Sequence, residues 1–179
     1  MSTNPESAGS AADPILIEDL FLTDAFLIKG RLPNKSMRLS NALEENERAF
    51  LAIEDATMVS LRSAEVIRTP RVLVNCHEVI FAHELLEIGG DDVLRKLAEP
   101  NKAVRIRAFY SGTVQLELAG QVEPGAYEAG HGAGRKYFIM QTPRLRGIDL
   151  RANEELRVLQ GLEYAIVRKD KLSYVYDFS

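Results

Sequence analysis

The chain has 179 residues and a net charge of −4, and 46% of its residues are hydrophobic, close to the average for globular domains. No apolar run approaches the roughly 20 residues that a bilayer span requires, and the single cysteine excludes an internal disulfide framework. These features predict a cytoplasmic protein of one domain or two small ones. The overall acidity argues against general nucleic-acid binding, which depends on neutralising phosphates.

The charge is unevenly distributed along the chain. Residues 1–100 carry 10 Lys/Arg and 17 Asp/Glu, a net −7, whereas residues 101–179 carry 12 and 9, a net +3. A charge asymmetry of this size favours head-to-tail docking, either between the two halves or between neighbouring subunits. Drift in the composition of solvated faces is the alternative explanation.

The N-terminal segment 1–13 is rich in Ser, Ala, Asn, Pro and Gly and lacks the basic and apolar regions of a signal peptide. We therefore expect a disordered leader. The apolar segment 14–22 that follows predicts an edge strand or a helical turn that packs onto the body or onto a partner. Its partner-binding side chains would be Ile15, Leu16, Leu20 and Phe21.

The first module is expected over residues 14–88. Alternation of period two predicts a strand at 25–32. Another strand is expected at 48–53, with 57–61 as its continuation or as the next strand. Leu39 and Leu43, four residues apart, predict one side of a short helix with Ser40 as its N-cap. The apolar segments 72–74 and 79–82 predict a β-hairpin around a four-residue loop.

A linker helix is expected at 91–98 within the segment 89–101, since Asp91 is a suitable N-cap and Pro100 would end it. The second module then covers residues 102–179. It is expected to contain strands over 103–118 and 136–141, a short helix at 152–160 and a closing hairpin of 164–167 and 172–176. The loop 119–134 between the first two strands holds five glycines.

Residues 26–84 and 108–177 follow one weak pattern of apolar segments, with Gly30 matched to Gly112 and Val74 to Val167. The predicted fold is therefore mainly β with short helices, of the α+β class. Two related halves, each a small β-barrel or β-sandwich, would be joined by the linker helix. A repeat carried by apolar alternation, with little repeated polar chemistry, argues for a scaffold.

Reactive side chains are densest at Asn75-Cys76-His77-Glu78. A Cys/His pair offers a thiolate nucleophile or metal ligands. Adjacent residues of a tight turn point to different sides, however, and the chain adds only His83 and His131. A locally hydrogen-bonded loop is the favoured interpretation, so no catalytic residue, metal or cofactor is predicted.

Basic residues gather in the second half. The segment 130–136 resembles a phosphate cradle superficially, but it lacks the Lys–Ser/Thr pair and the following helix of a P-loop. Arg144 and Arg146, together with Arg135, Lys136 and the turn at 168–171, could instead form an anion-binding face. Docking of this basic face onto the acidic half of another subunit is the favoured alternative.

Three segments resemble a family of small bacterial β-rich domains of unknown function. They read R-L-S-x-x-L at 38–43, F-L-x-I-x-D-A at 50–56 and V-L-V-N-x-x-E-V-I at 72–80. The resemblance covers about residues 26–84, and residues 108–177 retain only its apolar skeleton. It implies a fold and no activity, and Cys76 stands where the family pattern has Lys.

These observations predict a non-enzymatic structural or accessory subunit of a bacterial protein assembly, with a protein partner or a homo-oligomer as its context. The first alternative is a ligand-sensing, nucleotide-binding or nucleic-acid-binding module that uses the basic face. The second, least favoured, is an enzyme that uses Cys76 and His77.

Overall fold

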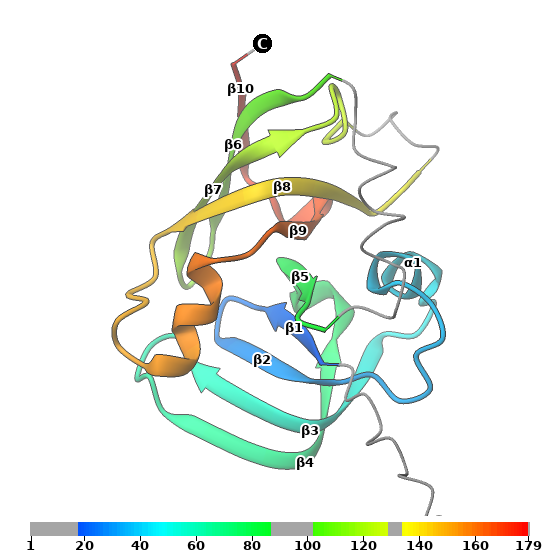
Figure 1. Ribbon diagram of the computed structural model, residues 1–179, viewed down its shortest axis with the longest axis vertical. Coiled ribbons are helices and arrows are strands. Elements are labelled where there is room, and N and C mark those ends of the chain that lie inside the picture. Colours follow the sequence, from blue (N-terminus) through cyan, green and yellow to red (C-terminus); the bar gives the residue numbers. More distant parts are fainter. Residues whose placement is uncertain (1–17, 87–101, 129–133, 179) are drawn as a thin grey trace, which may run out of the picture.

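The computed structural model describes residues 18–86, 102–128 and 134–178. Ten strands form one open antiparallel sheet in the order β10-β6-β7-β8-β9-β5-β1-β2-β3-β4 (Figure 1). The predicted mainly β class is confirmed. The division of the chain into two barrels or sandwiches stays a prediction, since the strands observed belong to a single sheet.

The first half contributes one short helix and five strands: α1 (Leu39–Glu45), β1 (Asp19–Leu22), β2 (Phe26–Arg31), β3 (Phe50–Ser60), β4 (Val66–Asn75) and β5 (Phe81–Glu84). The hairpin expected over 72–82 is wrong. A 3-10 turn, η1 (Cys76–Glu78), redirects the chain so that β4 pairs with β3, whereas β5 pairs with β1 and β9.

The second half contributes five more strands and two 3-10 segments: β6 (Val104–Ser111), β7 (Gln115–Val122), β8 (Tyr137–Arg146), β9 (Tyr164–Arg168), β10 (Tyr174–Asp177), η2 (Glu154–Gln160) and η3 (Lys169–Lys171). The region 103–118 is a β6–β7 hairpin. The helix expected at 152–160 is present as η2. The expected closing hairpin is wrong, because β9 pairs with β8 and β10 with β6. The linker helix at 91–98 lies outside the described residues.

The strand order of the first half, β5-β1-β2-β3-β4, recurs in the second half as β10-β6-β7-β8-β9. The halves meet where β5 pairs antiparallel with β9, with Phe81 opposite Val167 and Ala82 opposite Ile166. The Arg168 N–H also donates to the Ile80 carbonyl at 3.0 Å. We call this β5–β9 contact the junction.

Two apolar cores lie on opposite faces of the sheet at the junction. Leu20, Leu22 and Phe81 pack into a core made mostly by the second half, which we call the second core. Phe21 and Ala82 face the other way, into a first core made mostly by the first half. The strands at the centre are therefore buried on both faces. An edge strand or helical turn was expected at 14–22, but β1 is a central strand between β5 and β2.

Each half bends at a glycine in its second strand. The register with the neighbouring strand shifts at Gly30 and again at Gly120. A Cβ on Gly30 would lie 2.6 Å from Ile53 Cγ2, and one on Gly120 would lie 2.5 Å from Met140 Cγ. Only glycine permits these close approaches, so the two bulges curl the sheet around its cores.

Candidate functional site

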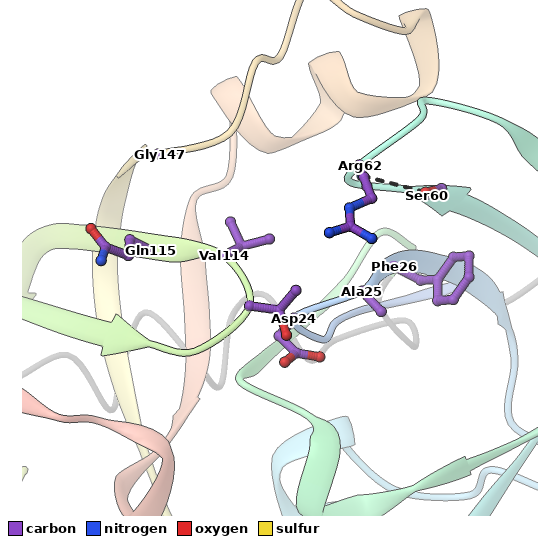
Figure 2. A pocket seen from close by; sticks show the side chains of 9 residues that line it. Asp24, Ala25, Phe26, Ser60, Arg62, Val114, Gln115 and Gly147 are labelled. Carbon is purple, nitrogen blue, oxygen red and sulfur yellow. Dashed lines mark hydrogen bonds between the residues drawn. The ribbon is translucent and has the colours of Figure 1, made fainter.

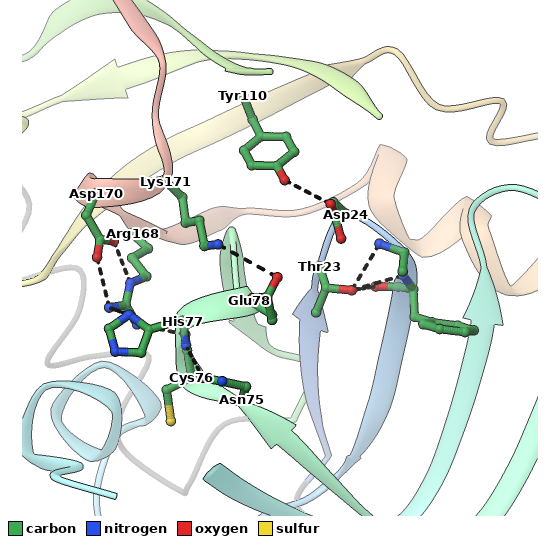
Figure 3. A network of polar contacts seen from close by, with 12 residues as sticks. Thr23, Asp24, Asn75, Cys76, His77, Glu78, Tyr110, Arg168, Asp170 and Lys171 are labelled. Carbon is green, nitrogen blue, oxygen red and sulfur yellow. Dashed lines mark hydrogen bonds and ion pairs between the residues drawn. The ribbon is translucent and has the colours of Figure 1, made fainter. Parts of the chain in front are cut away.

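The cluster at Cys76 is a structural turn (Figure 3). The thiol is buried, with Sγ 2.8 Å from Asn46 Nδ2 and 3.4 Å from the Arg48 carbonyl. Burial raises the pKa of the Cys76 thiol, which disfavours the thiolate needed for nucleophilic attack. His77 Nδ1 lies 3.1 Å from an Arg168 nitrogen. Within the described ranges, no three His, Cys, Asp or Glu side chains are placed to hold a metal ion.

Arg168 is buried and ties the two halves together (Figure 3). Its guanidinium donates to the Cys76 carbonyl at 2.7 Å, to the Tyr137 hydroxyl at 3.3 Å and to Asp170 Oδ2 at 3.0 Å. Hydrogen bonding to Arg168 lowers the pKa of Asp170. The turn expected to add charge to a basic face thus directs its arginine inward, into a contact that spans the junction.

A buried polar cluster that the sequence did not reveal lies on the first-core side of the junction. Lys35 Nζ is 2.7 Å from both Asp19 Oδ1 and Glu84 Oε1, and Tyr164 donates to Glu84 Oε2 at 2.9 Å. The Leu39 N–H donates to Glu84 at 2.8 Å, so this carboxylate, not Ser40, receives the first N–H of α1. Lys35 falls in a turn-like sequence, and no local pattern marks it as buried.

The carboxyl groups of this cluster respond differently to burial. Desolvation raises the pKa of Asp19 to about 6, although the hydrogen bond from Lys35 opposes the change. Burial also acts upward on Glu84, but hydrogen bonds from Lys35 and the Leu39 N–H lower its pKa overall. One Lys and two carboxyl groups share the site, so its net charge depends on the protonation of Asp19.

The predicted basic residues do not come together. Lys136 lies against the end of α1, where its N–H donates to Glu44 Oε2 at 3.0 Å and its Nζ contacts the Asn46 carbonyl at 3.5 Å. Arg135 is exposed beside it. Arg144 and Arg146 lie at the other end of β8. The face expected from all four residues is therefore divided.

Arg144 and Arg146 belong instead to an aromatic and basic surface on the outer side of four strands. Cross-strand pairs share a face, and the register places Tyr176, Arg107, Ala119 and Arg144 in one row and Tyr174, Phe109, Glu117 and Arg146 in the next. The Phe109 and Tyr176 rings lie 5.8 Å apart, and the Arg107 guanidinium lies 5.6 Å from the Phe178 ring. We call this surface the β10 face.

The opposite edge of the sheet also exposes apolar side chains. Leu73 and Ile67 project from β4 near its two ends. Phe50, on β3 opposite Asn75, lies near Leu73, whereas Ile67 pairs with Met58 further along the two strands. Eight large hydrophobic side chains are exposed in the described segments. Six of them lie on or beside the two outermost parts of the sheet: Phe50, Ile67, Leu73, Tyr174, Tyr176 and Phe178. Exposed apolar side chains that gather in this way are typical of interaction surfaces.

A cleft of about 520 Å³ lies where turns of the two halves meet (Figure 2). Asp24 and Arg62 supply its charged groups from the first half, and Gln115 lines it from the second. Asp24 already accepts a hydrogen bond from the Tyr110 hydroxyl at 3.1 Å. The Arg62 side chain extends into the space (Figure 2), which leaves one guanidinium as the main group for a ligand.

Two of the predicted partner-binding residues are inaccessible. Leu20 and Phe21 are fully buried, one in each core of the chain itself. Ile15 and Leu16 lie outside the described residues. The signal that suggested partner contact, dense apolar character, instead reflects a strand buried on both faces.

No family model, curated protein or solved structure matches this chain. In the part of the chain that the structure describes, no helix has both the length and the apolar composition to cross a bilayer. The exposed surfaces that could carry a function are therefore the two edges of the sheet, the β10 face and the cleft.

Proposed function

We propose that the chain is a non-enzymatic subunit of a protein assembly and docks through the two outer edges of its sheet. The gathering of six exposed apolar side chains at these edges carries the proposal. Outer strands also present unpaired backbone groups that can extend a sheet into a neighbour. Tyr and Arg, which prevail on the β10 face, are favoured at the centres of protein interfaces.

We propose further that the two halves are copies of one five-stranded unit. Three backbone hydrogen bonds of the first half have counterparts of nearly equal length in the second. Cys76 N to Ala49 O (2.9 Å) corresponds to Lys169 N to Lys136 O (2.9 Å), and Ile80 N to Leu22 O (2.8 Å) corresponds to Ser173 N to Phe109 O (2.7 Å). Leu85 N to Glu18 O (2.9 Å) corresponds to Phe178 N to Arg105 O (3.0 Å). On this alignment Gly30 corresponds to the bulge glycine Gly120, because Gly112 lies in the β6–β7 turn.

Photo-crosslinking tests the assembly proposal. A benzophenone amino acid would replace Leu73 or Tyr174 in cells that naturally produce the chain, with position 62 in the cleft as the control. We expect protein adducts from positions 73 and 174 and none from position 62. Absence of protein adducts at both edge positions, in a chain shown to be folded, would overturn the proposal.

A second candidate function is binding of single-stranded nucleic acid on the β10 face. Exposed aromatic rings interleaved with arginines on four adjacent strands can stack bases and neutralise phosphates. Fluorescence anisotropy with single-stranded DNA and RNA oligonucleotides tests it. If this function is correct, Tyr176→Ala and Arg144→Ala/Arg146→Ala should each bind the oligonucleotide more weakly than the wild type. The affinity should fall steeply as the salt concentration rises, and Arg151→Ala should leave it unchanged. Absence of binding at low salt removes it.

A further inference from the structure

We infer that the partner at both edges is a second copy of the chain, with β10 of one copy paired to β4 of the next. This contact between two molecules would have the same arrangement as the junction, which joins β5 to β9 within one molecule. This inference rests on the proposed function, because it names the partner that the exposed edges receive.

The sheet order makes the two edges complementary. In each half the outermost strands are the fourth and the fifth in chain order: β4 and β5, then β9 and β10. The junction joins the fifth strand of the first half to the fourth strand of the second half. The strands left at the ends of the sheet are the fourth of the first half and the fifth of the second. The two end strands are therefore a fourth and a fifth strand, like the two strands that pair at the junction.

Burial at the junction indicates which exposed side chains of the β10 face would be covered by a second copy. Phe81 of β5 packs in the second core and is 0% exposed. Its counterpart in β10, Tyr174, is 68% exposed. Leu22 of β1, opposite Phe81, is likewise buried in the second core, and Phe109 of β6 occupies the same place opposite Tyr174. The β10 face thus corresponds to the surface that the first half buries against the second.

The β4 edge shows the same relation from the other side. Ile166 of β9 and Tyr137 of β8 pack in the first core and are 1% and 5% exposed. Their counterparts are Leu73 of β4, 58% exposed, and Phe50 of β3, 51% exposed. Both edges therefore expose apolar side chains at the positions where the junction covers them. A second copy would cover both sets at once.

The junction also supplies the register between copies. Phe81 lies opposite Val167 and Ala82 opposite Ile166. The equivalent alignment places Tyr174 opposite Val74 of the next copy and Val175 opposite its Leu73. The bond from the Arg168 N–H to the Ile80 carbonyl would be repeated by an Asn75 N–H and a Ser173 carbonyl.

Charge supports the same alignment. Glu84 and Tyr164, which are hydrogen-bonded across the junction at 2.9 Å, correspond to Asp177 and Arg71. The register would place this carboxylate opposite this guanidinium. On a larger scale, the contact brings the half with net charge +3 against the half with net charge −7.

A contact between two different edges is heterologous, so each copy has one donor edge and one acceptor edge. Association continues until a ring closes or a filament grows. Blocking one edge of every copy stops it completely. When copies blocked at β4 are mixed with copies blocked at β10, each pair can form one contact, between the two edges that remain free.

Native mass spectrometry and light scattering of the full chain test the inference with Leu73→Glu, which blocks β4, and Tyr174→Glu, which blocks β10. Both residues are exposed, so neither change disturbs a core, and thermal unfolding checks the fold. Met37→Glu, at an exposed apolar site away from both edges, is the matched control. Wild type and the control should form species larger than a dimer, each edge variant should be monomeric, and an equal mixture should give a heterodimer.

Three results would overturn the inference: a monomeric wild type, an edge variant that still forms a homodimer, or a mixture that stays monomeric. The proposed function fails separately, because it concerns any protein partner. A monomeric wild type that still crosslinks to another protein through position 174 contradicts self-assembly only. Oligonucleotide binding without protein adducts contradicts both.

Discussion

Buried charge at Lys35, Asp19 and Glu84 makes the residues near the junction sensitive to pH. The three side chains are almost wholly inaccessible, and Asp19 Oδ2 has no hydrogen-bond partner among the described residues. Desolvation therefore dominates at Asp19 and raises its pKa to about 6. The folded state holds this proton more tightly than the unfolded state.

The raised pKa of Asp19 predicts a defined pH dependence. Between the ordinary value of 3.8 and about 6 the folded chain binds more protons, so this group makes stability fall as pH rises through that window. Asp19→Asn retains an acceptor for Lys35 and removes the charge. At pH 7 we expect the variant to be more stable than the wild type by roughly 1–3 kcal/mol. Its stability should also lack the decrease that Asp19 causes as pH rises to about 6.

Urea denaturation of the wild type and Asp19→Asn between pH 4 and pH 7 measures the difference. The lowered pKa of Glu84 acts in the opposite sense, since the stability it contributes is lost as pH falls. Glu84 is present in both proteins, so the difference between their profiles reports mainly on Asp19. Parallel profiles of stability against pH for the two proteins would contradict the raised pKa of Asp19.

Arg168 is the second residue with a clear energetic prediction. Arg168→Met would leave the Cys76 carbonyl and the Tyr137 hydroxyl without a donor inside the junction. We expect a loss of about 2–3 kcal/mol in the free energy of unfolding. Arg168→Lys should recover only part of it, because an ammonium cannot reproduce the planar set of donors. Arg151→Met, at an exposed site, is the control, and a stable Arg168→Met variant would refute the role.

At the scale of elements, much of the sheet could be predicted and its pairing could not. Apolar alternation indicated a strand around 25–32, and strands were also expected around 136–141 and 164–167. The Leu39/Leu43 spacing indicated α1, and both leucines are buried. The two expected hairpins failed because η1 and η3 turn the chain toward strands that are distant in sequence. Such pairing is decided by burial on both faces of β1, β5 and β9, which local periodicity does not encode.

The candidate site was predicted even less completely, for a related reason. Cys76 and His77 are reactive residue types, yet their environment is set by Asn46 and Arg168, which come from remote segments. Exposure of Tyr174 and Leu73 likewise depends on which strands end the sheet. The asymmetry of charge was visible in the sequence, but the positions of the two exposed edges were not.

The bulge glycines make a prediction for single elements. Gly30→Ala or Gly120→Ala would place a Cβ within 2.7 Å of a backbone carbonyl oxygen, that of Glu54 or Gln141. We expect each change to destabilise the protein by about 1–3 kcal/mol in chemical denaturation, because the bulge must open. Gly161→Ala, where a Cβ meets nothing within 4 Å, is the control. Equal stability of the three variants would show that the bulges are not tightly packed.

At the scale of the whole molecule, one type of contact would be used twice, within the chain and between copies. The junction buries Phe81 and Ile166 within the chain, while the corresponding Tyr174 and Leu73 stay exposed at its ends. A single chain therefore satisfies half of the contacts that its two halves can make. Head-to-tail association would satisfy the rest with the same type of interface, and it would bring together halves of opposite net charge.

Disulfide trapping between copies tests this central claim most directly. Tyr176 and Val72 correspond to His83 and Ala165, and antiparallel pairing as in the junction places them opposite each other, close enough for a disulfide. Tyr176→Cys and Val72→Cys chains, mixed under mild oxidation, should form a dimer linked through 176 and 72 by peptide mapping. Tyr176→Cys mixed with Arg71→Cys, one residue out of register, should link poorly. Equal linkage in the two mixtures, or none in the first, would contradict the account.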